Sequence, residues 1–204
     1  MFARSTTIKG DPGAIDAGIA YIRDEVMPTL LMQDGCVGMS LVVDRDSGRC
    51  IATSSWRDEQ SMHVSDEMLA PARARAGELL GGSPQVEEWE VAVMHRDHAT
   101  SGGACCRITW ARPRELDRGI EMWRTTVLGE LEMMSGFCSA SMLLDRSRGM
   151  TVSTAVFDSR EALMATRERA RELRDQTARE HGVAFLDVEE FDLAIAHLRI
   201  PELV

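Results

Sequence analysis

Apolar residues recur at helical spacing in two stretches of this chain that lie 101 residues apart. In each stretch five apolar side chains follow one another at intervals of four, three, four and four residues, which places them on one face of a helix. The first helix is expected to begin with Asp11 as its N-cap and Pro12 as its first helical residue. Gly35 and Gly136 are expected to end the two helices. The apolar positions are Ile15, Ile19, Ile22, Val26 and Leu30 in the first stretch and Leu116, Ile120, Trp123, Val127 and Leu131 in the second.

Each predicted helix is followed by two short apolar runs that are joined by a polar turn. Residues 35–56 and 136–157 share a glycine, an apolar run, Asp-Arg, a turn that ends in glycine, a second apolar run and an aromatic residue. This pattern predicts a β-hairpin. Both faces of the hairpin strands are apolar, whereas an antiparallel sheet ordinarily leaves one face in water. We therefore expect both faces of each sheet to be covered.

A first strand, a second helix and a last strand complete each stretch. The first strands are short, the second helices are rich in Ala, Arg and Glu, and the last strands come after them. The resulting order is β-α-β-β-α-β, that of a ferredoxin-like unit. The expected ranges are 2–8, 58–79 and 85–94 in the first stretch and 105–110, 159–181 and 186–196 in the second.

The two stretches are interpreted as a tandem duplication. A shift of 101 residues aligns identical residues from the first helix through the hairpin, and a shift of 102 places VEEWEVAVMH on VEEFDLAIAH. Self-similarity of this kind indicates repeated units. We place the first repeat at residues 1–98 and the second at 104–204, on either side of the linker-like Gly/Ser-rich segment 98–104.

The predicted fold class is α+β, with two ferredoxin-like β-α-β-β-α-β repeats whose antiparallel sheets pack as a dimeric-type α/β barrel. Helices would cover one face of each sheet, and the sheet of the other repeat would cover the second face. Fusion makes this pairing intramolecular. We expect a monomer with an internal pseudo-dimer, or a homodimer that forms through sheet edges.

Composition narrows the classes of partner. The 204 residues carry a net charge of −10 without a Lys/Arg-rich block, which argues against nucleic acid and anionic membranes. No stretch approaches the ~20 apolar residues of a membrane span, and no signal peptide is evident. Five cysteines, an odd number, fit reduced thiols, and Cys105 and Cys106 are interpreted as small core residues rather than a redox pair. These features predict a cytoplasmic protein.

The element order and one short motif resemble the antibiotic biosynthesis monooxygenase (ABM) domain of the dimeric α/β barrel superfamily. The motif is a strand that ends in Trp, a short turn with Asp, Glu or Ser, and a helix that carries a His. The first repeat matches the motif, and the second lacks the His. The corresponding residues are Trp56, Asp58, Glu59 and His63 in the first repeat and Phe157, Ser159, Glu161 and Met164 in the second.

The resemblance implies a ligand site between sheet and helices or within the barrel. Family members include cofactor-free monooxygenases of polycyclic aromatic substrates and heme-degrading enzymes. We hypothesise an ABM-like monooxygenase that acts on a flat apolar small molecule without a metal or bound flavin. Both member types rely on an Asn, which this chain lacks. That absence and the unequal repeats favour the alternative, a non-catalytic small-molecule-binding or scaffold protein on the same barrel. A further alternative is a heme-binding or heme-degrading protein.

His63, Trp56 and Arg23 are the candidate site residues. Histidine ordinarily titrates near neutral pH, so a helix-borne His63 suits a general base; otherwise it is a surface residue. Trp56 would stack on a flat substrate, unless it is a core aromatic like Phe157 at the matching position. Arg23, which Arg124 matches, would bind an anionic group of the substrate or pair with acids at the helix edge. A single active cleft is expected in the first repeat.

Three other features of the sequence have weaker support as parts of a functional site. His95 and His98 form an HxxH pattern that suits a metal, but the matching position of the second repeat has a single His, and we predict no metal site. The adjacent pairs Glu87-Glu88 and 189–190 point to opposite faces of a strand, so at most one carboxylate in each repeat faces inward. Five methionines either line an adaptable apolar pocket or fill core gaps: Met32, Met39, Met133, Met134 and Met142.

Overall fold

The structure is a computed structural model that describes residues 1–100 and 102–198. These residues form two compact units. Unit 1 holds Met1–Glu90 and the segment that begins at Leu193, and unit 2 holds Val91–Asp192. The last strand of each half of the sequence is therefore divided between the units. No helix in the described ranges is long and apolar enough to cross a membrane.

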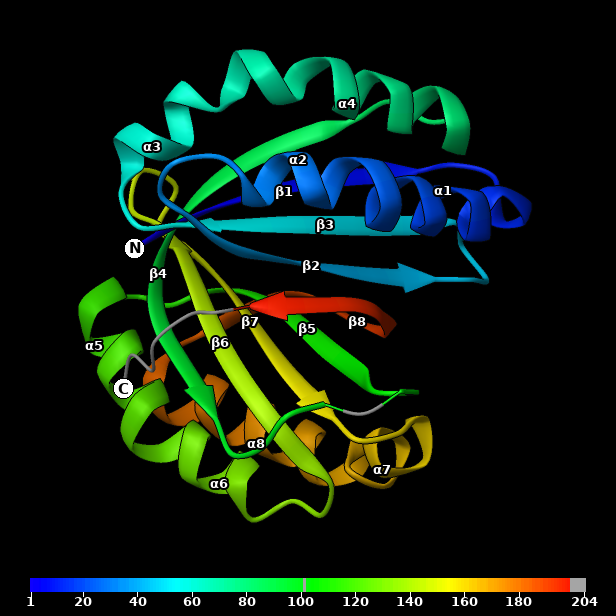
Figure 1. Cartoon of the computed structure of the whole chain (residues 1–204). Helices are drawn as coiled ribbons and strands as arrows, with labels where there is room; N and C mark the ends of the chain where they lie inside the picture. The colour runs from blue at the N-terminus through cyan, green and yellow to red at the C-terminus, as the bar shows by residue number, and fades with distance from the viewer. Residues whose placement is uncertain (101, 199–204) are drawn as a thin grey trace. The chain divides into compact units, whose positions relative to one another are not determined.

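Unit 1 consists of antiparallel strands with helices along one face (Figure 1). Its first helical segment is not uniform, since a 3-10 turn (η1) precedes it and a π-helical turn (η2) lies within it. The elements are β1 (Phe2–Lys9), η1 (Pro12–Ala14), α1 (Ile15–Tyr21), η2 (Ile22–Val26), α2 (Met27–Leu31), β2 (Cys36–Asp44), β3 (Arg49–Trp56), α3 (Glu59–Val64), α4 (Asp66–Leu80) and the first part of β4 (Gln85–Arg96).

Unit 2 repeats this order, again with its helices on one face of its strands (Figure 1). The order confirms the predicted β-α-β-β-α-β sequence of elements, although each predicted helix is divided into shorter segments. The elements are β5 (Cys105–Arg112), α5 (Leu116–Met122), the π-helical turn η3 (Trp123–Val127), α6 (Leu128–Glu132), β6 (Phe137–Asp145), β7 (Met150–Phe157), α7 (Arg160–Ala165), α8 (Arg167–His181) and β8 (Ala184–Leu198).

The strands pair in the same way in both units. In unit 1 β1 lies between β4 and β3, and β3 pairs with β2; in unit 2 β5 lies between β8 and β7, and β7 pairs with β6. All of these pairs are antiparallel, and Phe2 faces Trp56 just as Cys105 faces Phe157. The hydrogen-bonded order is β1-β3-β2-β8-β5-β7-β6-β4, closed into a barrel. The predicted fold class is confirmed.

Each hairpin carries a β-bulge near the start of its first strand. The register against β3 shifts between Cys36 and Gly38, and the register against β7 shifts between Phe137 and Ser139. A bulge inserts one extra residue and re-aims a side chain. The extra residue is Val37 in unit 1 and Cys138 in unit 2.

The helices end and break at positions that differ from the prediction. The first helices end at Leu31 and Glu132, short of the two glycines, which lie in the turn before the next strand. The second helices break at Ser65 and Thr166, whose hydroxyls donate hydrogen bonds of 2.7 and 2.8 Å to carbonyls three residues earlier. Such local bonds compete with continuous helix formation. Both second helices then end at a glycine in the left-handed region, as expected for a C-cap.

Each unit has its own apolar core between its sheet and its helices. Trp56 in unit 1 and Phe157 in unit 2 are fully buried in these cores. Phe157 meets Phe137 edge to face, with the ring centroids 6.2 Å apart. Cys105 and Cys106 are both buried, and burial raises the pKa of the Cys105 thiol to about 11.

Candidate functional site

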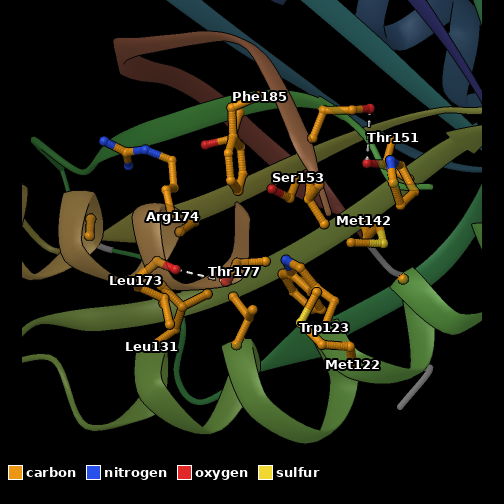
Figure 2. Close-up of a pocket in the computed structure, with 18 of the residues that line it drawn as sticks. Met122, Trp123, Leu131, Met142, Thr151, Ser153, Leu173, Arg174, Thr177 and Phe185 are labelled. Atoms are coloured by element: carbon orange, nitrogen blue, oxygen red, sulfur yellow. Dashed lines mark hydrogen bonds between the residues drawn. The ribbon is translucent and has the colours of Figure 1, made fainter. Parts of the chain in front are cut away.

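Unit 2 contains an apolar cavity of about 90 Å³ between its sheet and its helices (Figure 2). We call this cavity the C-terminal pocket. Strands β5 to β8 supply one wall, and α5, η3, α6 and α8 supply the other. Trp123, Met142 and Phe185 are among its large apolar residues. A single water needs roughly 10–15 Å³ on the same measure, so the pocket has space for several waters or for an organic molecule in their place.

The pocket exists because neighbouring strands present small side chains to the helices. Thr151, Ser153 and Ala155 alternate along β7 and therefore share one face of the sheet. Thr109 and Ala111 do the same on β5, and all five line the cavity. Protein interiors are otherwise close-packed, so small residues on both central strands leave open the volume that larger side chains would fill.

Unit 1 has a corresponding cavity of about 70 Å³, the N-terminal pocket. Ile22 and Ala52 line it at the positions where unit 2 has Trp123 and Ser153. Both pockets thus form at the π-helical turn of the first helix and at the middle of the second hairpin strand. π-Helical turns are frequent at functional sites.

A buried arginine lines the C-terminal pocket. Arg107 is 5% exposed, and it donates hydrogen bonds of 2.8 and 3.2 Å to Glu190 Oε1, one of 3.0 Å to Thr166 Oγ1 and one of 3.1 Å to the carbonyl of Leu163. Burial raises the pKa of Glu190, but hydrogen bonds from Arg167 and Arg107 outweigh that effect and hold the pKa below its ordinary value. The carboxylate is therefore ionised at neutral pH.

Arg4 occupies the same place in unit 1. It is 2% exposed and donates hydrogen bonds of 2.8 and 3.1 Å to Glu88 Oε1 and one of 3.2 Å to Ser65 Oγ. Burial raises the pKa of Glu88, yet hydrogen bonds from Arg4 and His63 more than offset that effect and lower it. Both pockets are therefore lined by a buried arginine that is paired with a glutamate.

A second arginine distinguishes the two pockets. In unit 1 Arg73 donates a hydrogen bond of 2.6 Å to the carboxylate of Asp66. The matching Arg174 lines the C-terminal pocket (Figure 2), but the position of Asp66 is taken by Arg167. Arg174 makes no hydrogen bond or ion pair within the described ranges 1–100 and 102–198. Burial lowers the pKa of its guanidinium and the charge of Arg107 lowers it further, whereas the charges of Asp175 and Glu190 oppose this shift without cancelling it. A nearby anion would therefore stabilise the charged form.

The charged groups around these arginines consequently differ between the two units. In unit 1 two guanidinium groups are matched by two carboxylates, whereas in unit 2 four guanidinium groups are matched by two carboxylates, which leaves a net charge of +2. The groups are Arg4, Arg73, Asp66 and Glu88 in unit 1 and Arg107, Arg167, Arg171, Arg174, Asp175 and Glu190 in unit 2.

The three residues expected at a site from the sequence lie in different surroundings. The side chain of His63 is 52% exposed, and its Nε2 lies 2.9 Å from Glu88 Oε2. Trp56 is fully buried, and its indole donates a hydrogen bond of 3.0 Å to Ser54 Oγ. Arg23 is exposed and binds Asp24 at 2.7 Å. None of the three lines either pocket, and the structure does not bring them together.

The histidines of the HxxH pattern have separate partners. His95 Nε2 lies 2.9 Å from a carboxylate oxygen of Glu132, and its ring stacks on Phe137. His98 instead contacts Asp97 and Asp158, at 2.8 and 3.0 Å.

The methionines divide between the two expectations. Met39 and Met142 line the N-terminal and C-terminal pockets. Met32 and Met133 are 77% and 74% exposed, while Met134 is buried in the core.

Sequence reasoning missed the arginines that charge the C-terminal pocket. A signal for them is present in the repeat itself: the 101-residue shift places Arg73 on Arg174 and Asp66 on Arg167. That comparison shows a charge reversal at one position beside an unchanged arginine. It does not reveal that the arginine lines a cavity, because the cavity depends on how the helix packs on the sheet.

No protein-family model matches the chain, but close relatives exist. The uncharacterized protein Rv2557 of Mycobacterium tuberculosis is 52% identical over 206 residues, which cover 100% of this chain and 92% of the relative. The uncharacterized protein Rv2558 of the same organism is 53% identical over 207 residues, which cover 100% of this chain and 88% of the relative.

Solved structures share the fold at low sequence identity. A proposed monooxygenase from Lactobacillus acidophilus NCFM superimposes with a TM-score of 0.69 at 9% identity, over 97% of this chain and 96% of the other. An anthrone oxidase-like protein superimposes with a TM-score of 0.64 at 16% identity, over 94% of this chain and 90% of the other. The heme-degrading enzyme LmHde from Listeria monocytogenes superimposes with a TM-score of 0.54 at 9% identity, over 94% of this chain and 99% of the other. This chain therefore shares its fold with these proteins and with a ferredoxin-fold protein from Listeria monocytogenes that is related to antibiotic biosynthesis monooxygenases.

Proposed function

The chain belongs to the family of the Mycobacterium tuberculosis proteins Rv2557 and Rv2558, and we propose that it is an ABM-like monooxygenase. Its substrate would be a flat, mainly apolar small molecule with one acidic group, oxidised in the C-terminal pocket without a metal or bound flavin. The observation that carries this proposal is an apolar cavity lined by Arg174, whose guanidinium makes no ion pair within the described ranges of the chain.

The pocket is suited to a ring system that carries an oxyanion. Trp123 and Phe185 offer aromatic surface to a flat molecule. A guanidinium that is partly removed from water and makes no ion pair favours an anionic group, because that group supplies the hydrogen-bonded partner that the guanidinium lacks. A phenol or enol that ionises beside Arg174 would have a lowered pKa for the same reason.

Ionisation of the substrate is the step that this pocket assists. Neither Asp, Glu nor His is among the described lining residues of the C-terminal pocket, so the proton leaves the acidic substrate for solvent rather than for a side chain. The resulting carbanion, R₂CH⁻, reacts with O₂ to form R₂CH–OO⁻. Protonation and loss of water give R₂C=O, so that R₂CH₂ and O₂ become R₂C=O and H₂O. The substrate supplies all four electrons, and no external reductant is required.

The anthrone oxidase-like protein and the L. acidophilus protein share this fold, which supports the choice of reaction. Fold similarity alone does not assign a substrate. The polar end of the pocket adds the chemical reason, since a cation stabilises the negative charge that develops before oxygen reacts.

His63 reaches the N-terminal pocket only through other residues. It contacts Glu88, which in turn binds Arg4, and Arg4 lines the pocket. The competing proposal is that His63 acts as a general base and that the reaction takes place in unit 1. A neutral substitution of His63 separates the two assignments.

Binding is measured first, with alizarin, which ionises near neutral pH, and anthraquinone, which does not. Quenching of tryptophan fluorescence reports binding, and Trp123→Phe identifies the signal that comes from the C-terminal pocket. We expect alizarin to bind and Arg174→Met to weaken it at least tenfold, with anthraquinone binding unchanged. The matched control is Arg73→Met in the N-terminal pocket, which should leave alizarin binding unaltered.

Catalysis is measured with anthrone under ¹⁸O₂. Enzyme-dependent O₂ uptake with one ¹⁸O atom in anthraquinone is the expected result, reduced at least tenfold by Arg174→Met and unaffected by His63→Ala. Loss of turnover in His63→Ala with full turnover in Arg174→Met would move the site to unit 1. Tight alizarin binding without O₂ uptake would favour the non-catalytic binding protein. Hemin that binds more tightly than alizarin would favour the heme alternative.

A further inference from the structure

A cluster of potential metal ligands lies in unit 2, outside the C-terminal pocket. His98 follows strand β4, Cys138 lies in β6, and Asp158 follows β7. One ligand atom from each of the three residues lies within 4.8 Å of the other two. None of them lines the pocket, so the cluster is unrelated to the reaction proposed above.

The spacing of these atoms is close to that of a tetrahedral metal site. His98 Nε2 lies 3.0 Å from Asp158 Oδ1, and Cys138 Sγ lies 3.2 Å from the same oxygen. Zinc bonds of about 2.0–2.3 Å place neighbouring ligand atoms about 3.3–3.8 Å apart in a tetrahedron. Small side-chain rotations therefore suffice to admit an ion between the three atoms.

A fourth residue orients the imidazole. His98 Nδ1 lies 2.8 Å from Asp97 Oδ2. A carboxylate that accepts a hydrogen bond from one ring nitrogen leaves the other nitrogen with its lone pair free for a metal, and this arrangement is usual around metal-bound histidines. The backbone N–H of Asp97 also donates a 2.9 Å hydrogen bond to the carbonyl of Cys138, which joins the chain segments that carry two of the ligands.

The β-bulge of unit 2 positions the thiol. Cys138 is the extra residue of that bulge, and it is fully buried, whereas the side chains of His98 and Asp158 are 42% and 43% exposed. An ion could enter from the exposed side and meet a thiol that solvent does not reach. In unit 1 the corresponding residues are Val37 and Arg57, neither of which suits a zinc site.

We propose that His98, Cys138 and Asp158 bind a divalent transition-metal ion of the zinc type, with solvent in the fourth position. The mixed nitrogen, sulfur and oxygen ligands favour zinc or cobalt over magnesium or calcium, which prefer oxygen alone. Binding releases the thiol proton of Cys138 to solvent, and the sulfur then binds as a thiolate.

The test uses the full chain, freed of metal by chelation and titrated with Co²⁺. A thiolate ligand gives an intense sulfur-to-cobalt charge-transfer absorption, and competition with Zn²⁺ then gives the zinc affinity. We expect one Co²⁺ per chain with this absorption, its loss in Cys138→Ser, and at least tenfold weaker binding in His98→Gln and Asp158→Asn. Asp97→Asn should weaken binding about tenfold, as removal of such a supporting carboxylate typically does.

Cys105→Ser is the matched control. Cys105 is also buried, and its Sγ lies 3.4 Å from Asp192 Oδ1, but Arg160 binds that carboxylate and Cys105 belongs to no metal-ligand cluster in the described part of the chain. The Co²⁺ absorption should persist in this variant. Absence of the absorption in the native chain, or its persistence in Cys138→Ser, would overturn the proposal. Circular dichroism of the metal-free variants verifies folding, and the exposed His98 and Asp158 variants serve if Cys138→Ser does not fold.

Discussion

The guanidinium of Arg73 lies 2.6 Å from the carboxylate of Asp66, and this one ion pair distinguishes the two pockets. At the matching positions unit 2 has Arg174 and Arg167. Arg167 turns to Glu190, at 2.6 Å, and Arg174, which lines the apolar cavity, makes no ion pair within the described ranges. A single charge reversal thus converts a neutral pocket end into a cationic one.

Restoring the acid in unit 2 should therefore abolish anion recognition. Arg167→Asp would place a carboxylate where Asp66 stands in unit 1, and we expect alizarin affinity to fall at least tenfold because Arg174 gains an internal counter-ion. Binding of neutral anthraquinone should not change. Arg179→Asp, an exposed change of equal charge in the last turn of the same helix, is the control. Equal losses in the two variants would indicate a general electrostatic effect instead of a local pair.

Filling the C-terminal pocket should block binding without unfolding the protein. Ser153→Leu adds apolar volume inside the cavity, and Ala52→Leu does so at the matching place in the N-terminal pocket. We expect Ser153→Leu to eliminate fluorescence quenching by alizarin and Ala52→Leu to preserve it. Overpacking of a filled core typically costs about 1–3 kcal/mol of stability. Because the added side chains occupy empty space in each cavity, we expect a smaller cost, and the melting temperature should fall by only a few degrees. The assignment of the pocket fails if the two variants bind alizarin equally well.

The buried ion pair of unit 2 should matter for stability. In Arg107→Met, Glu190 keeps only the exposed Arg167 as a cationic partner, although the Glu190 side chain is only 16% exposed. Removal of one partner of a buried ion pair costs about 3–5 kcal/mol. We expect a loss near the lower limit, about 3 kcal/mol, in urea unfolding. Arg107→Met with Glu190→Gln should be less destabilised than Arg107→Met alone. Arg167→Met, at a 55% exposed side chain, should cost under about 1 kcal/mol.

The hairpin turn of unit 2 should contribute stability that depends on pH. Hydrogen bonds from the Ser147 hydroxyl and the Arg148 backbone lower the pKa of Asp145 to about 2, against an ordinary value of 3.8. Because the unfolded chain binds the proton more readily, the stabilisation is complete above about pH 4 and is lost as the pH falls through about 2. Water screens this turn, so we expect only about 1 kcal/mol.

The measurement is urea unfolding of Asp145→Asn from pH 2 to pH 7. The variant should be less stable than the native chain at pH 7 and equal to it near pH 2. Asp46→Asn, an exposed change in the other hairpin turn, should follow the native curve. A constant difference between Asp145→Asn and the native chain at all pH values would assign the effect to packing.

The interpretation of His63 shows where sequence reasoning stopped. The motif around Trp56 and His63 correctly indicated the fold, because a strand that ends in an aromatic and a capped helix after it are local features. It did not place either residue at a cavity. Trp56 is fully buried in the core, whereas His63 is half-exposed and contacts Glu88. Both placements depend on how α3 and α4 pack against β1 and β4.

By itself, the sequence determined the repeated β-α-β-β-α-β order, the hairpins and the α+β class, since periodicity, turn residues and caps act over a few neighbouring positions. Only the tertiary structure decided that the small side chains of β5 and β7 face a helix across an open space, and that Arg174 lines this space without an ion pair in the described part of the chain. It also brought His98, Cys138 and Asp158 together across 60 residues of chain. Cavities and charge clusters of this kind arise from contacts between distant segments, whose distances no local pattern encodes.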